Sequence, residues 1–208
     1  YLLLGQLMGG GMGMPRFEAA EVGNLEIAWL IPLALIGTVC GWLYFVSEHT
    51  SEALAHAIGD RPVVKAMLAG LALAICGTVL PYTMFAGETQ ADVLMETYLT
   101  IPAGVLIATG LVKAMLTPAL INLGWRGGHF FPVIFSGVSL GYGLAILTGA
   151  DPVFCVAVCT ASTMGAVMRQ PVMVVGLLLM CFPLKGIVCM IIAAVIAAGI
   201  PLPKPLRK

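Results

Sequence analysis

The sequence predicts an all-α, polytopic membrane protein whose transmembrane helices are tilted and broken. Of the 208 residues, 60% are hydrophobic and only 10% are charged, against roughly 25% charged residues in soluble domains. The mean hydropathy is +1.04. Because a membrane-spanning helix needs about 20 apolar residues, the chain has room for about six or seven spans, some of them interrupted. We therefore expect residues 1–208 to form a single transmembrane domain.

The first third of the chain alternates between apolar and polar segments. Residues 1–14 are apolar and glycine-rich without a basic leader, so we expect the chain to begin within a helix and not with a signal peptide. A span is predicted over residues 25–46. Charged and histidine side chains then mark residues 47–65 as the longest polar loop. The next span covers residues 63–80 and stops at Pro81.

The segment 81–98 is acidic. It carries Glu88, Asp92 and Glu96 but no lysine or arginine, and the spacing of four places these carboxylates on one helical face. Two interpretations remain open. Glu88 belongs to a cation or proton path, because carboxylates within a membrane are commonly functional, or the helix faces water on the non-cytoplasmic side.

A further span over residues 100–123 contains Lys113, the one basic residue deep within an apolar segment. Its ammonium group either adds positive potential to an anion path or reaches an interface or a carboxylate partner. Arg126, which follows this span, either steers anions or marks an interface.

Residues 124–149 join a glycine-rich turn to a helix of membrane length, predicted to begin at Phe130. Glycine lets a backbone turn tightly and approach a ligand, and proline suits the first turn of a helix. The first amides of such a helix have no partner within the helix and carry roughly +0.5 elementary charge from the aligned peptide dipoles, so a small anion is the expected ligand. The predicted anion-binding residues are Gly127, Gly128, His129, Phe130, Phe131 and Pro132.

Two details of this helix are also predicted. His129 contributes its backbone amide, and its imidazole is either a proton-sensitive group or a packing group. Gly137 and Gly141 are expected to let the helix pack closely against a neighbour.

The C-terminal third contains short apolar segments over residues 152–167, 172–182 and 184–200. Asp151 and Pro152 suit a helix start, and the second segment is too short to cross a membrane perpendicularly. By the positive-inside rule, Lys204, Arg207 and Lys208 place the C-terminus in the cytoplasm. The loop 47–65 and Arg169 would share that side, with the acidic segment opposite.

Several functions are not expected. The chain has ten basic and ten acidic residues, so its formal net charge of zero argues against a nucleic-acid partner. It contains no nucleophile elbow, phosphate loop or HEXXH motif, so neither catalysis nor a cofactor is expected. A metal site made of His49, Glu52 and His56 lacks a further ligand, and the six cysteines are expected to act as small packing residues.

The sequence nevertheless resembles a known family. The run from Gly128 to Pro132, Gly-His-Phe-Phe-Pro, is similar to the GxFxP anion-binding motif of the CLC chloride channels and transporters. Arg169-Gln170-Pro171 resembles the family's R-x-P segment between two late membrane helices, and residues 80–87 lie where the family has a glycine-rich break.

This resemblance is to the C-terminal half of the family and covers nearly the whole chain. It implies an inverted-repeat fold with a missing N-terminal half, a homodimer in which each subunit has its own pore, transport of chloride or a related anion, and a multi-pass location in the bacterial inner membrane. The family's gating glutamate and serine belong to the other half, and no tyrosine follows Tyr142 where the family has one near the ion. A membrane carrier of another class and a non-transporting membrane-bound partner remain as alternatives.

Overall fold

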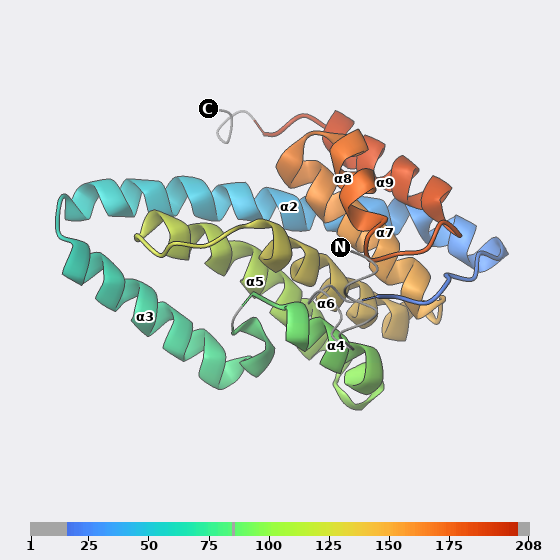
Figure 1. Cartoon of the computed structure of the whole chain (residues 1–208), viewed down its shortest axis with the longest axis horizontal. Helices are drawn as coiled ribbons and strands as arrows, with labels where there is room; N and C mark the ends of the chain where they lie inside the picture. The colour runs from blue at the N-terminus through green and yellow to red at the C-terminus, as the bar shows by residue number, and fades with distance from the viewer. Residues whose placement is uncertain (1–15, 85, 204–208) are drawn as a thin grey trace, which may run out of the picture.

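The computed structural model describes residues 16–84 and 86–203, and every regular element in this part of the chain is helical (Figure 1). The predicted segment 1–14 and the basic residues Lys204, Arg207 and Lys208 lie outside the described residues. The elements are α2 (Asn24–Ile58), α3 (Pro62–Val79), η1 (Pro81–Thr83), α4 (Glu88–Thr97), η2 (Tyr98–Thr100), α5 (Ala103–Asn122), α6 (Phe130–Thr148), α7 (Pro152–Met168), α8 (Pro171–Leu178) and α9 (Ile187–Gly199).

The lengths of these helices confirm the predicted class. Among the described residues, four helices, α2, α3, α5 and α6, are long and apolar enough to cross a membrane. The 35 residues of α2 rise about 52 Å at about 1.5 Å per residue. Because the hydrocarbon core is about 30 Å thick, α2 lies tilted or extends beyond it. The other helices are shorter, as expected of broken spans.

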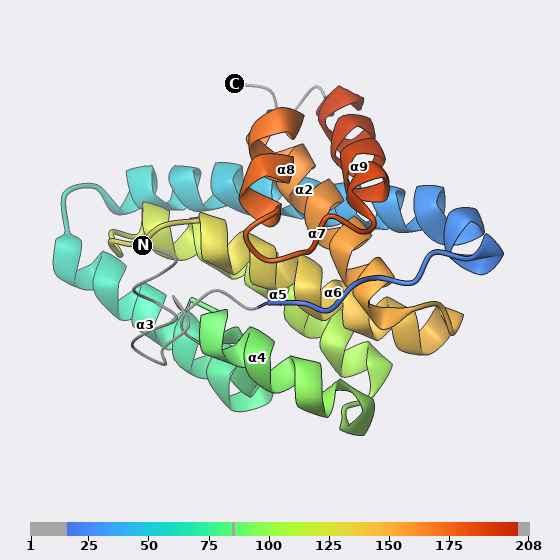
Figure 2. The same cartoon turned by 45° about the vertical axis from the view of Figure 1, so that its right-hand side comes forward.

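Helix α7 is the centre of the bundle. Its side chains from Phe154 to Ala166 are all buried, and it packs against α2, α6 and α9, while α8 and α9 lie side by side at one edge (Figures 1 and 2). The carboxylate of Asp151 accepts a hydrogen bond of 2.7 Å from the amide of Phe154, which confirms the predicted helix start.

The contact between α6 and α7 depends on small residues. A Cβ atom added to Gly141 would lie 2.5 Å from the Cα atom of Val156, and a Cβ atom on Gly137 would collide with the backbone of Thr160. The absence of these two side chains lets the helices approach closely, which confirms the predicted role of the two glycines.

The predicted polar loop over residues 47–65 is wrong, because α2 continues to Ile58. Two groups on α5 hold this extension. The hydroxyl of Ser47 donates a hydrogen bond of 2.5 Å to the carbonyl oxygen of Met115. The side-chain amide of Asn122 donates to the carbonyl oxygen of Glu48 at 3.0 Å and to the hydroxyl of Ser51 at 2.8 Å. Packing on α5 therefore keeps a polar sequence helical.

The chain between α3 and α5 is broken as the prolines and glycines predict. Helix α3 stands apart from the bundle and buries only Ala69 (Figure 1). After η1, Gly87 adopts φ +106° and begins α4, which packs on α6. A Cβ atom on Gly87 would lie 2.5 Å from that of Phe135, so both the backbone conformation and the space require glycine here.

Candidate functional site

The site is built around the first turn of α6, which begins at Phe130 as predicted. The first amide of the helix to donate within it is that of Val133, at 3.1 Å from the carbonyl oxygen of His129. Among the described residues, the amides of His129, Phe130 and Phe131 donate to no protein acceptor. They are the donors that a helix start leaves available, and the positive end of the helix dipole lies with them.

The glycines before α6 are not required by the fold. The positive φ of this turn, 98°, occurs at Gly124 and not at Gly127 or Gly128. Within the part of the chain that the structure describes, a Cβ atom at Gly127 or Gly128 would meet nothing within 4 Å. Both residues are exposed. They leave the backbone open to close approach from outside.

A cavity of about 230 Å³ lies beside this turn, between α3, α5 and residues 125–128. It brings together five of the predicted residues: Lys113, Arg126, Gly127, Gly128 and Pro132. The remaining walls are mostly apolar: Leu73, Ala86, Leu116, Thr117, Leu120, Ile121 and Trp125.

Lys113 is the buried charge of the cavity. Its side chain is only 4% exposed, and its Nζ atom donates a hydrogen bond of 2.7 Å to the carbonyl oxygen of Thr83. This carbonyl belongs to η1, in the break between α3 and α4. The ammonium group is thus directed toward the break in the membrane segment, and its positive charge lies on the same cavity as the turn before α6.

Arg126 and Trp125 form the open side of the cavity. Both residues are exposed, and 45% of Trp125 is accessible to solvent. The cavity therefore has one cation at its exposed side and one at its buried side, separated by apolar walls. Positive groups in a low-dielectric cleft attract anions.

The side chains of the motif itself face elsewhere. The imidazole of His129 stacks on the ring of Phe130 at 4.6 Å between centroids and lies 6.5 Å from the ring of Tyr44, which is the packing arrangement considered for it. Phe130 and Phe131 line a second cavity of about 220 Å³, together with Ile134, Met173, Leu177 and Cys181. The backbone at the start of α6 thus lies between two cavities.

Glu88 lies outside this site. It occupies the first turn of α4, is half-buried and does not line the cavity, although its neighbour Ala86 does. Asp92 and Glu96 are exposed on the same helix. Partial desolvation of the Asp92 carboxyl raises its pKa, and the negative charge of Glu96 raises it further.

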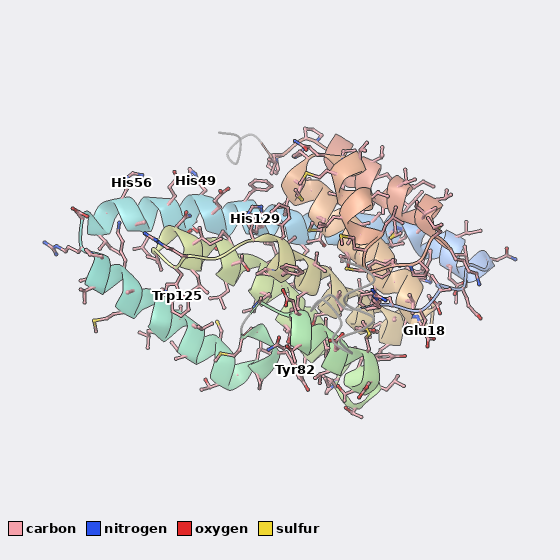
Figure 3. The ribbon with its side chains drawn as sticks, in the orientation of Figure 1. Glu18, His49, His56, Tyr82, Trp125 and His129 are labelled. Atoms are coloured by element: carbon pink, nitrogen blue, oxygen red, sulfur yellow. The ribbon has the colours of Figure 1, made fainter. Side chains whose placement is uncertain are left out.

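No metal centre accompanies these groups in residues 16–84 and 86–203, where no cluster of three or more His, Cys, Asp or Glu side chains could hold an ion. His49 and His56 project from the outer face of α2 (Figure 3).

The sequence analysis did not identify Ala86 and Trp125, which line the cavity, or Thr83, which accepts the hydrogen bond of Lys113. Thr83 takes part through its carbonyl oxygen, which leaves no signature in a sequence. Ala86 is a common residue in apolar segments, and Trp125 adjoins the motif but is not part of it. The break at Pro81 was the one available signal for this region.

The chain is similar to known proteins in sequence and in fold. A sequence model described as voltage gated chloride channel matches residues 3–201. A search of curated proteins found no match. Among solved structures, the crystal structure of a CLC-type fluoride/proton antiporter is similar, with a TM-score of 0.76 and 21% sequence identity over 98% of this chain and 52% of the antiporter chain. The chain thus spans about half of that antiporter, and the likeness shows a shared fold.

Proposed function

Because the chain belongs to the voltage-gated chloride channel family, we propose that it forms half of a membrane pathway for chloride or a related small anion. The anion is bound by the backbone amides at the start of α6. The observation that carries this proposal is the set of amides at His129, Phe130 and Phe131 that donate to no protein acceptor in the described part of the chain. Backbone amides in a membrane need either protein, water or a ligand.

The chemistry of the site suits a transported ion. An isolated charge is very costly in hydrocarbon, and the amides replace part of the hydration shell of an anion. No cation touches the anion in this arrangement, because the guanidinium of Arg126 lies at the exposed side and the ammonium of Lys113 is bonded to Thr83. Binding by dipoles is weak enough for release, and release is a condition of transport.

The cavity serves as the route to these amides. An anion enters past Arg126 and Trp125 and reaches the exposed backbone at Gly127 and Gly128, directly before these amides. Glycine at these two positions keeps Cβ atoms out of the path. Glu88 is then a proton-path or structural residue outside the anion route.

The assembly proposed for the chain follows its family. A second, N-terminal half would supply the other side of the anion site, since the chain covers 52% of the antiporter that it resembles. We place the protein in the bacterial inner membrane as a multi-pass homodimer with one pore in each subunit. No catalytic reaction and no cofactor belong to this function.

The ion is chloride or fluoride. We propose chloride because of the family. We propose fluoride because the solved structure with the similar fold is described as a fluoride/proton antiporter. The amides can donate to either ion, because both halides accept hydrogen bonds from the start of a helix.

Efflux from liposomes tests the proposal. The full-length protein is reconstituted into vesicles loaded with potassium chloride or potassium fluoride, and valinomycin starts efflux that an ion-selective electrode records. We expect efflux of at least one of the two ions well above that of protein-free vesicles. Efflux no faster than in protein-free vesicles, from protein that is monodisperse in detergent, would contradict an anion pathway and favour a non-transporting partner. Efflux of a larger organic anion, loaded in place of the halide, without efflux of chloride or fluoride would favour a carrier of another class.

A further inference from the structure

The break between α3 and α4 forms one wall of the cavity beside α6. Its described residues, 81–84 and 86–87, contain η1 and the left-handed Gly87, and Ala86 lines the cavity. A short irregular segment has few hydrogen bonds of its own. Its position therefore depends on what holds it from outside.

Among the described residues, one contact near each end of the break joins it to a neighbouring helix. At the start, the ammonium of Lys113 on α5 donates to the carbonyl oxygen of Thr83 at 2.7 Å, and this interaction crosses 30 positions of sequence. At the end, Gly87 lies against the ring of Phe135 on α6, without room for a Cβ atom. The segment is thus fastened to the two helices that flank the cavity.

A buried lysine makes this contact at a cost in desolvation free energy. A charged side chain deep in a membrane protein is costly unless it is paired or hydrogen-bonded, and a charge-assisted hydrogen bond is about twice as strong as a neutral one. Thr83 is the last residue of η1. The last carbonyl groups of a helix have no hydrogen-bond donor within that helix. The side chain of Thr83 is fully buried and donates to the carbonyl oxygen of Leu80, so its carbonyl faces the ammonium from a rigid turn.

We propose that Lys113 is a positioning residue that fastens the α3–α4 break to α5 and so sets the width of the cavity in front of α6. That the cavity carries an anion rests on the proposed function. The fastening itself does not, because it is a relationship between α5 and η1. Removal of the ammonium lets the break leave the cavity wall while α5, α6 and α7 remain packed.

Site-selective thiol labelling tests the fastening without any transport measurement. Thr83→Cys keeps the carbonyl and places a thiol at a fully buried position. Maleimide labelling of this cysteine in the full-length protein in detergent is followed by peptide mass spectrometry, with Lys113 intact, with Lys113→Met and with Lys113→Arg. The native Cys155, which is 0% exposed in α7, reports global unfolding in the same sample.

We expect Lys113→Met to label residue 83 about tenfold faster, the factor that corresponds to about 1.4 kcal/mol, while Cys155 stays protected. Lys113→Arg keeps a charged donor and is expected to restore most of the protection. An unchanged rate at residue 83 in Lys113→Met would overturn the inference. So would an equal increase at Cys155, because Lys113 would then stabilise the whole fold and not the break.

Efflux measurements on the same variants separate this inference from the proposed function. If the cavity carries the anion, Lys113→Met changes the anion concentration at half-maximal efflux and Lys113→Arg restores it. If Lys113→Met labels residue 83 selectively but leaves the anion concentration at half-maximal efflux unchanged, the claim that Lys113 sets the width of the cavity would be overturned. Absence of efflux in the parent protein would contradict the proposed function and leave the labelling result to decide the fastening.

Discussion

The guanidinium of Arg169 lies at the end of α7, and its Nη1 atom donates a hydrogen bond of 2.9 Å to the carbonyl oxygen of Ile200 at the end of α9. The same atom donates to the carbonyl oxygen of Ala198 at 3.0 Å. Arg169 adopts φ +58° and ends α7, and Pro171 begins α8. The Arg-Gln-Pro segment thus has a structural role, because it turns the chain and caps the last carbonyls of a helix 30 residues later.

Loss of this cap should destabilise the protein. Arg169→Ala removes both hydrogen bonds, and a bond to a charged group contributes about 1.5–3 kcal/mol, so we expect a clearly lower midpoint of thermal unfolding in detergent. Arg169→Lys keeps the charge but not the planar donor, so its unfolding midpoint should lie between those of the parent protein and Arg169→Ala. Lys185→Ala, an exposed cation in the same region, is the control and should leave the midpoint unchanged.

The contact of α6 with α7 predicts a different sensitivity to added volume. Gly141→Ala places a methyl group 2.5 Å from the Cα atom of Val156, and overpacking of this kind costs about 1–3 kcal/mol. Gly176→Ala is the matched control, since a Cβ atom there meets nothing within 4 Å among the described residues. It should stabilise α8 slightly. Equal unfolding midpoints for the two variants would contradict the close packing.

The polar extension of α2 depends on Asn122. Asn122→Ala deletes the hydrogen bonds to Glu48 and Ser51, which together contribute about 1–2 kcal/mol. Hydrogen exchange should accelerate over the last turns of α2 and remain unchanged in α7. Asn24→Ala, at the exposed start of α2, should not produce this pattern. Protection that stays the same in Asn122→Ala would show that the extension is held by other contacts.

Gly128 offers a variant that separates binding from stability. Gly128→Ala should change stability by less than about 0.5 kcal/mol, because the added methyl group meets no described atom. It should weaken anion binding about tenfold, or about 1.4 kcal/mol, by narrowing the approach to the amides. Gly124→Ala should lower the stability, because an alanine is strained at φ +98°. It should leave anion binding unchanged, because Gly124 does not line the cavity. Calorimetric titration and thermal unfolding measure the two quantities.

The helices that local signals define were predictable. The start of α6 at Phe130 follows from Pro132 in its first turn, and its end at Thr148 follows from Gly149, which adopts the left-handed conformation. Asp151 and Pro152 gave the start of α7 in the same way. These signals act through the backbone of the helix that contains them, so they are visible in a sequence.

Features that depend on distant residues were not predictable. The end of α2 was interpreted as a loop because its residues are polar, and it is held by contacts with α5, among them that of Asn122, 74 positions after Glu48. Likewise, Lys113 was identified as unusual, but its partner is a backbone carbonyl in a broken segment. The cavity that joins Lys113 to Gly128 arises only from the packing of α3, α5 and the turn.

Anion binding by Phe130→Pro tests the central claim most directly. Proline at this first position of α6 removes one amide, and the first turn of a helix tolerates it. Phe130→Ala is the matched control, because it removes the ring and keeps the amide. In isothermal titration of the full-length protein with chloride and fluoride, we expect the proline variant to bind the preferred ion at least about tenfold more weakly, since a hydrogen bond to a charged group contributes about 1.5–3 kcal/mol. We expect the alanine variant to remain close to the parent protein. A folded proline variant with the affinity of the parent protein would contradict anion binding by the backbone of α6.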